Sequence, residues 1–216
     1  MKQYKKTIIL TGLIILLPVL YGILMWSKLP DPMATHFGID GTPNGWSSKA
    51  FTVFGLPLLL LGIHMLCVFG QNAGEKKQEE IRHISRKMYG LFLWICPCVS
   101  VFCGILIYSY AVDVKVDTFQ MIQAFAALLF MAVGNYLPKC RQNHLIGIKL
   151  PWTLSDEENW NHTHRVTGWL WMIGGLVLLI NIFLRAERVL CVVFAVMVFV
   201  PVIYSAVYYF RHKKNL

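Results

Sequence analysis

Charged residues are scarce in this chain. Only 14% of its 216 residues are Asp, Glu, Lys or Arg, whereas 56% are hydrophobic. Because a soluble domain of this size normally carries about 25% charged residues, the composition excludes an ordinary soluble protein. Apolar runs of roughly 20 residues recur instead, and each is long enough to cross a hydrocarbon core of about 30 Å. We therefore predict an all-α polytopic membrane protein that forms a single integral membrane domain over residues 1–216. Its six transmembrane helices are expected near residues 7–26, 51–70, 89–111, 118–137, 166–184 and 189–209.

Several features that other classes of membrane protein need are also missing. The predicted spans contain no Asp, Glu, Lys or Arg, which disfavours an ion-coupled transport pathway. None of the six cysteines lies in a predicted outer loop, so a disulfide framework is not expected. No small-residue cleavage site follows the first apolar run, so we expect a retained membrane helix rather than a cleaved signal peptide.

The basic residues are distributed unevenly between the spans. Of the 20 Lys and Arg residues, 15 lie in one alternate set of intervals and 5 in the other. By the positive-inside rule, the richer set is cytoplasmic; it consists of both termini, the 71–88 loop and the 138–165 segment. The 27–50 loop is then extracellular. Topology thus accounts for the net charge of +9, and no direct contact with nucleic acid is expected.

The 27–50 loop is rich in proline and glycine. Pro43-Asn44-Gly45 is typical of a turn, so we predict a compact, ordered loop. Phe37 and Trp46 are expected at the level of the lipid headgroups, where aromatic side chains anchor membrane proteins.

The 138–165 segment is polar and also has the features of an ordered structure. Ser155 and Glu158 have the spacing of a capping box, which predicts a helix that begins at Ser155. Pro151 disfavours a helical conformation at Leu150, so residues 143–154 are expected to form a folded loop.

Polar side chains within the spans are few. His64 is a functional candidate because ionisable residues are costly in a membrane, although a neutral histidine that hydrogen-bonds to a backbone carbonyl or to a neighbouring span would also explain it. Asn135 is polar and lies near the inner end of its predicted span, so it could hydrogen-bond into the 143–154 loop. Cys96-Pro97-Cys98 resembles the triplet of heavy-metal pumps, but the chain has no room for their ATP-hydrolysing domain. No metal or other cofactor is expected.

Two stretches resemble the motifs of a known family. LPDPMATHFG (29–38), followed by GWSSK (45–49), resembles the Pro-Thr-His-Phe…Gly…Trp…Lys signature of the membrane domain at the start of SdpI-like proteins. NHLIGIKLPWTLS (143–155), followed by Trp160 and THR (163–165), is similar to the C-terminal SdpI motif. The chain is identified as a member of the SdpI family. One departure is Lys149-Leu150, where the family usually has Arg-Thr, since Lys lacks the planar guanidinium that pairs bidentately with anions.

The resemblance implies an immunity protein in the plasma membrane of a Gram-positive bacterium, and not an enzyme. Such a protein protects its producer from a secreted toxin that collapses the membrane potential. It also acts as a receptor that holds an ArsR-type repressor at the membrane. Membrane lipid, the toxin and the repressor are therefore the expected partners. The candidate residues of the extracellular face are Thr35, His36, Phe37, Trp46 and Lys49. Those of the cytoplasmic face are Asn143, Gly147, Lys149, Pro151, Trp152, Thr153, Trp160, His164 and Arg165.

Three alternatives remain open at this stage. The candidate residues could serve only to fold and anchor the two loops. A small transporter or channel would have to rely on His64 and polar amides. An enzyme would need a cytoplasmic site built from histidines and acids, although His162 and His164 are two residues apart and would face different sides of a helix. The residues available to that site are His144, Asp156, Glu157, Glu158, His162 and His164.

Overall fold

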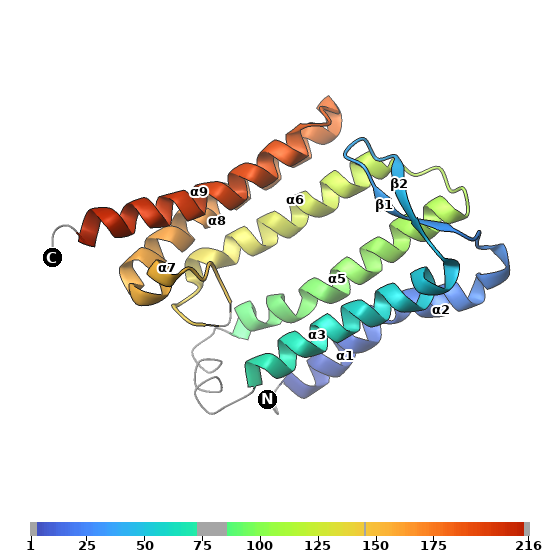
Figure 1. Cartoon of the computed structure of the whole chain (residues 1–216), viewed down its shortest axis with the longest axis horizontal. Coiled ribbons are helices and arrows are strands. Elements are labelled where there is room, and N and C mark those ends of the chain that lie inside the picture. Colours follow the sequence, from blue (N-terminus) through green and yellow to red (C-terminus); the bar gives the residue numbers. More distant parts are fainter. Residues whose placement is uncertain (1–3, 73–85, 145, 214–216) are drawn as a thin grey trace. The chain divides into compact units, whose positions relative to one another are not determined.

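Six helices of the computed structural model are long and apolar enough to cross a membrane, as predicted. The structure describes residues 4–72, 86–144 and 146–213. These residues are helical apart from one two-stranded sheet and the connecting loops (Figure 1). The six candidate spans are Lys5–Leu24, Phe51–Phe69, Lys87–Ala111, Thr118–Lys139, Glu157–Leu184 and Val189–His212.

The chain forms two units. The first comprises Met1–Glu75 and Gly90–Met121, and the second comprises Lys76–Tyr89 and Ile122–Leu216. The predicted 71–88 loop lies mostly outside the described residues.

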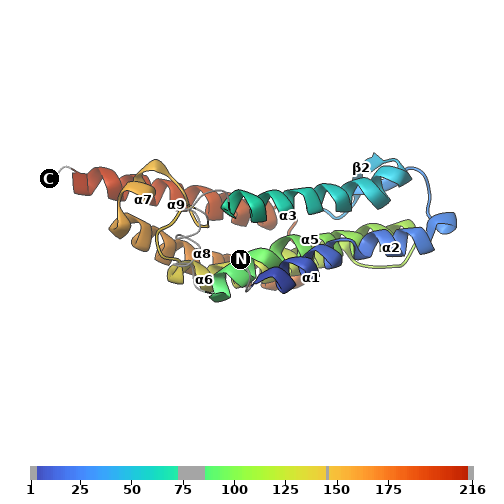
Figure 2. The same cartoon turned by 90° about the horizontal axis from the view of Figure 1, so that it is seen from below.

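The first unit begins with a span that is broken in the middle. α1 (Lys5–Ile15) and α2 (Leu17–Leu24) are separate helices, and the break lies two residues before Pro18, which has no N–H to continue the ladder. α5 (Arg86–Ala111) donates hydrogen bonds to carbonyl oxygens at this break. Ser100 donates to Ile15 O at 2.8 Å, and Tyr108 donates to Pro18 O at 2.8 Å. Figure 2 shows α1 and α2 in line with one another and beside α5.

The 27–50 loop contains the sheet. After the short helix η2 (Trp26–Lys28), strand β1 (Met33–Phe37) pairs antiparallel with β2 (Pro43–Ser47). The predicted turn at residues 43–45 is wrong, because these residues belong to β2. The chain reverses at residues 38–42 instead.

The local chemistry of residues 38–42 explains where the turn forms. Asp40 accepts hydrogen bonds from the backbone N–H of Thr42 at 3.0 Å and from its hydroxyl at 2.7 Å. These bonds hold the pKa of the Asp40 carboxyl below its ordinary value of 3.8. Gly41 has a φ of +81°, which favours glycine, and a Cβ there would lie only 2.8 Å from the backbone N of Phe119.

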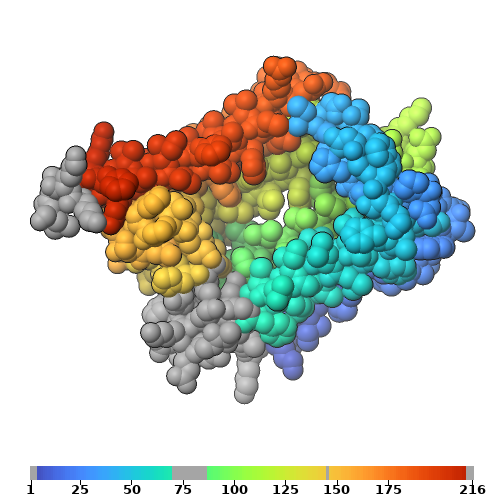
Figure 3. All heavy atoms as spheres, in the orientation of Figure 1, coloured from blue at the N-terminus to red at the C-terminus, as the bar shows by residue number. Residues whose placement is uncertain are grey.

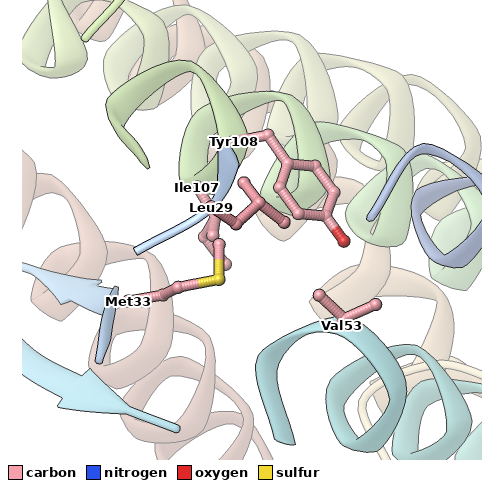
Figure 4. Packing of buried hydrophobic residues seen from close by; sticks show 5 residues of the cluster. All are labelled: Leu29, Met33, Val53, Ile107 and Tyr108. Carbon is pink, nitrogen blue, oxygen red and sulfur yellow. The ribbon is translucent and has the colours of Figure 1, made fainter. Parts of the chain in front are cut away.

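A small apolar cluster anchors the loop to the helices. Leu29 and Met33 pack against Val53, Ile107 and Tyr108, and all five side chains are buried (Figure 4). Val53 belongs to the π-helical turn η3 (Phe51–Gly55), which leads into α3 (Leu56–Asn72). The loop is therefore ordered, as predicted.

The second unit is formed mainly by three long helices. α6 (Thr118–Tyr136) continues into the short helix η4 (Leu137–Lys139). α7 (Pro151–Ser155), α8 (Glu157–Leu184) and α9 (Val189–Lys213) follow.

Small residues bring these helices close together. A Cβ on Gly134 of α6 would lie 2.9 Å from the carbonyl oxygen of Gly168 in α8, and one on Gly175 would lie 2.4 Å from Met131 Cγ. Gly174 faces α9 instead, where a Cβ would meet Met197 Sδ at 2.8 Å. Glycines thus allow α8 to pack against both neighbours, as small residues commonly do in membranes.

Candidate functional site

The 138–165 segment precedes α8 and continues into its first turns. Asp156 caps this helix: its carboxylate accepts hydrogen bonds from the backbone N–H groups of Glu158 at 2.9 Å and Asn159 at 3.1 Å. The predicted start at Ser155 is therefore wrong by two residues. Ser155 instead ends α7, where its hydroxyl donates to Trp152 O at 3.3 Å. Asp and Ser are about equally good N-caps, so composition alone does not distinguish them.

The expected loop over 143–154 contains a helical turn that the sequence reading missed. Pro151 occupies the first position of α7, where its missing N–H costs nothing. Leu150 before it is extended, with φ −113° and ψ 154°, as the proline predicts. Thr153 is fully buried, and its hydroxyl accepts from the N–H of Leu150 at 2.9 Å and lies 2.8 Å from Ile148 O.

Trp160 and His164 form the buried centre of the segment. Their exposed fractions are 0% and 1%, and their rings stack with centroids 4.0 Å apart. The Trp160 indole donates to Cys140 O at 2.7 Å. His164 Nδ1 lies 2.8 Å from Trp160 O, and its Nε2 lies 3.0 Å from the backbone N of Ile148.

These two contacts determine the tautomer of His164. A carbonyl oxygen only accepts and a backbone N–H only donates, so Nδ1 carries the proton and Nε2 is unprotonated. Protonation of Nε2 would break the bond from Ile148. His164 is thus a neutral clamp that holds the loop onto α8.

Gly147 is required at the closest approach of the loop to these rings. Its φ is +127°, a value that side-chain-bearing residues rarely adopt. A Cβ there would lie 2.5 Å from His164 Nε2 and 2.8 Å from the Trp160 ring. The loop can cover the two rings only because this position has no side chain.

Asn143 organises the first part of the loop. Its amide nitrogen donates to Arg141 O at 2.7 Å and Ile146 O at 3.2 Å, while its oxygen accepts from Ile146 N at 2.8 Å. The neighbouring Cys140 is buried, which raises the pKa of its thiol even though Asn143 hydrogen-bonds to it. The thiol therefore stays protonated and can donate to Ile146 O at 3.4 Å.

Trp152 attaches the loop to α9. Its indole donates to the Ser205 hydroxyl at 2.9 Å, and Asn159 donates to Ser205 O at 3.0 Å. In Figure 3 the spheres of this part of the chain (amber) lie directly against those of α9 (red). Neither Ser205 nor Asn159 was singled out from the sequence. The polar residues Asn159, Thr163 and Thr167, spaced four apart in α8, were a usable signal for a buried polar face.

The remaining predicted residues of this segment are exposed. Lys149 is exposed and its ammonium donates to His144 O at 3.4 Å, and Arg165 is exposed as well. Asn135 is also exposed and makes no side-chain hydrogen bond within residues 4–72, 86–144 and 146–213, so its expected bond into the 143–154 loop is not formed. The segment thus presents cations on its surface over a neutral, buried interior.

On the whole, the candidate residues of the 27–50 loop lie nearer the surface than those of the 138–165 segment. Thr35 and Ser47 hydroxyls lie 3.1 Å apart across the two strands, and His36 hydrogen-bonds to Asn44. His36 is nevertheless exposed, and Trp46 is 55% exposed. Phe37 packs edge-on against Tyr110, with centroids 5.6 Å apart.

Lys49 closes the base of the same loop. Its ammonium donates to Trp26 O at 3.2 Å and Leu29 O at 3.0 Å, and it lies 5.0 Å from the centroid of the Trp26 ring. The backbone N–H of Lys49 donates to the Asp31 carboxylate at 3.0 Å. Lys49 therefore joins both ends of the loop.

The intramembrane His64 has a structural partner. It is 2% exposed and its Nε2 lies 3.0 Å from the Thr11 hydroxyl in α1. That hydroxyl donates to Ile8 O at 3.0 Å, so His64 acts as the donor. The expected bond to a neighbouring span is thus formed.

The histidines and acids of the enzyme alternative do not converge. His162 is 45% exposed and lies 3.9 Å from Glu158, while His164 is buried within the loop contact. Among the described residues, no three His, Cys, Asp or Glu side chains are placed to share a metal ion.

Comparison with known proteins adds independent evidence. Residues 139–208 match the SdpI/YfhL protein family, and residues 13–61 match a domain of unknown function, DUF1648. The chain is 24% identical over 211 residues to Immunity protein SdpI of Bacillus subtilis (strain 168), which covers 97% of each chain. No solved structure gives a significant match.

Proposed function

We propose that this chain, of which residues 139–208 match the SdpI/YfhL family, is a membrane immunity protein that protects its cell from a secreted, membrane-active toxin. The observation that carries the proposal is the match over 97% of both chains to a relative named an immunity protein. Six apolar spans fit a multi-pass protein of the plasma membrane, in a Gram-positive bacterium like that relative. The role is one of binding, without catalysis.

The exposed part of the 27–50 loop is the proposed contact for the toxin. His36 and Trp46 project from adjacent strands and are exposed, whereas Thr35, Phe37 and Lys49 have partners within the unit. An exposed aromatic side chain beside a polar one is typical of binding surfaces. Thr35, Phe37 and Lys49 are proposed to shape the loop, and His36 and Trp46 to contact the toxin.

The 138–165 segment is the proposed contact for an ArsR-type repressor. Its buried residues form the scaffold, and the exposed Lys149 and Arg165 supply two cations. Such a surface is complementary to an acidic patch on a partner. The two proposed contacts belong to different loops, so protection and repressor capture should be separable.

The first experiment expresses the chain in a toxin-sensitive bacterium that lacks its own immunity gene. Retained membrane potential after toxin addition is expected. A collapse as fast as in empty-vector cells, with the protein present in the membrane, would contradict the immunity role.

Variants then separate the two contacts. Trp46→Ala should lose protection, while Arg165→Ala should keep protection and lose co-sedimentation of the repressor with membranes. Lys28→Ala, which changes another exposed residue, is the matched control and should keep both. Equal loss of both outputs in Trp46→Ala and Arg165→Ala, at normal protein levels, would rule out separate contacts.

A further inference from the structure

A groove of about 350 Å³ runs between α2 and α5 in the first unit. Leu17, Pro18 and Tyr21 line one wall. The other wall is formed by residues of α5 and of the loop that follows it, namely Val101, Gly104, Ile105, Tyr108, Ser109, Val112 and Val114. None of the described residues that line it is charged. Leu17 and Ile105 on its rim are 50% and 52% exposed, so the groove is open along one side.

Contacts between α2 and α5 fix the separation of the two walls. Pro18 lies against Gly104, where a Cβ would be 2.9 Å from the proline ring. Tyr108 donates to Pro18 O at 2.8 Å, and its ring lies 5.1 Å from that of Tyr21. Tyr108 also belongs to the cluster that anchors the 27–50 loop. The groove is therefore a preformed part of the unit.

The length and volume of the groove limit which ligands it can hold. Val101 and Val112 are eleven residues apart, which corresponds to about 16 Å at 1.5 Å per residue. This length is about half of a 30 Å hydrocarbon core, the depth of one leaflet. A helical segment about 16 Å long and about 10–12 Å in diameter fills roughly 1,300–1,800 Å³. All of the empty space along the groove amounts to about 730 Å³, so a helix does not fit inside it.

An extended peptide is also disfavoured. Each of its backbone N–H and C=O groups would need a partner at membrane depth. The side chains that line the groove offer only the hydroxyls of Tyr21, Tyr108 and Ser109, too few for a peptide backbone, and that of Tyr108 is already bonded to Pro18. A hydrocarbon chain has no such requirement. At its outer end the groove reaches Val114, which lies between the exposed residues Asp113 and Lys115, so this end is at the polar surface of the membrane.

We propose that the groove binds one acyl chain of a phospholipid from the leaflet on the side of the 27–50 loop. The bilayer supplies this ligand, and the groove orders a chain that would otherwise be fluid. The bound lipid lies directly beneath the cluster that supports the loop. This site is independent of the immunity role, because it follows from the shape of α2 and α5 alone.

The test uses the full chain in vesicles of phosphatidylglycerol that contain a trace of the same lipid with a diazirine in one acyl chain. After photolysis and digestion, mass spectrometry should find adducts concentrated on residues 17–21 and 101–112. Ser109→Trp and Val101→Trp each fill the groove and should reduce this labelling to the level of the lipid-facing side of α3. Leu59→Trp, at a position of α3 that is 57% exposed, is the matched control and should leave it unchanged.

Circular dichroism and gel filtration establish that each variant is folded before labelling is compared. Equal labelling of the groove and of α3 in the unmodified protein would overturn the proposal, as would full labelling in both folded groove variants. Labelling of the walls by a photoreactive apolar peptide, but not by the lipid, would assign the groove to a peptide and would also overturn it.

Discussion

The 27–50 loop and the 138–165 segment are both ordered polar connections, yet they are stabilised in different ways. The first is a two-stranded hairpin supported by backbone pairing and a small apolar cluster, and its His36 and Trp46 remain exposed. The second is held by buried side chains that bond to the backbone, and it encloses Trp160 and His164 completely. Two polar connections that both contain histidine and tryptophan therefore present an exposed surface in one case and form a buried scaffold in the other.

Because of this difference, we expect mutations in the two regions to affect different properties, stability in one and binding in the other. Substituting a buried member of the 138–165 segment removes a partner from another buried group, so it lowers stability before it affects any binding. Substituting an exposed residue of the 27–50 loop leaves the fold intact.

Gly147→Ala should have the largest effect. The substitution places a methyl group 2.5 Å from His164 Nε2 at a φ of +127°, and strain at such positions costs about 1–3 kcal/mol before the clash is counted. Thermal unfolding in detergent should show a strongly lowered midpoint. Gly62→Ala is the control, because a Cβ there meets nothing within 4 Å, and it should be neutral or slightly stabilising. Equal midpoints for the two variants would contradict the role of Gly147.

His164→Phe tests the clamp while keeping a ring to stack on Trp160. The variant leaves the N–H of Ile148 without its partner, which should cost about 1–3 kcal/mol. His162→Phe, at a side chain that is 45% exposed, should change stability by no more than about 0.5 kcal/mol. A lower unfolding midpoint for His162→Phe than for His164→Phe would contradict the assignment of His164, and not His162, as the histidine that stabilises the segment.

Lys49→Met should have a smaller effect, confined to the 27–50 loop. The ammonium bonds to two carbonyl oxygens at the base of the loop, and we expect a loss of about 1 kcal/mol. Hydrogen exchange should become faster at the amides of β1 and β2 and stay unchanged in α8. Lys28→Met changes an exposed lysine nearby and should leave all of these rates unaltered.

Asp40 should give the smallest effect, because it is fully exposed. Its folded-state pKa is depressed below 3.8 by the bonds from Thr42. The stabilisation of the turn is therefore present above pH 3.8 and is lost as the pH falls through the folded-state pKa. The amide resonance of Thr42 should titrate with a midpoint below 3.8, and Asp40→Asn should abolish this titration. A midpoint above 3.8 would contradict the bonding at the turn.

Much of the fold was predictable from the sequence because each element has a local cause. The six spans follow from apolar length, and the break before Pro18 follows from a missing N–H. Hydrogen bonding of His64 to a neighbouring span was also anticipated, since an unpaired polar group in a membrane is costly. Two local predictions were wrong, the turn at residues 43–45 and the helix start at Ser155, because each stretch contains several residues suited to the same position.

The candidate site was less predictable, because its residues take their roles from distant partners. Arg165 and His164 are adjacent in the sequence, yet one is exposed and the other is buried. Gln123 was not singled out, although its amide is buried without a hydrogen-bond partner among the described residues. Helical spacing places Trp160, His164 and Thr167 on one face of α8 and Arg165 on another, but the groups that cover the buried face come from other parts of the chain.

Six membrane-crossing helices and ordered loops follow from the amino-acid sequence, because the bilayer requires apolar length and a hydrogen-bonded backbone in every span. Which polar residues are buried as scaffold and which stay exposed depends on how the chain folds in three dimensions. Trp152 meets Ser205 across 53 residues, and Trp160 meets Cys140 across 20. Such contacts form only when the helices pack against one another. How they pack depends on the shapes of the facing surfaces, which local sequence patterns do not reveal.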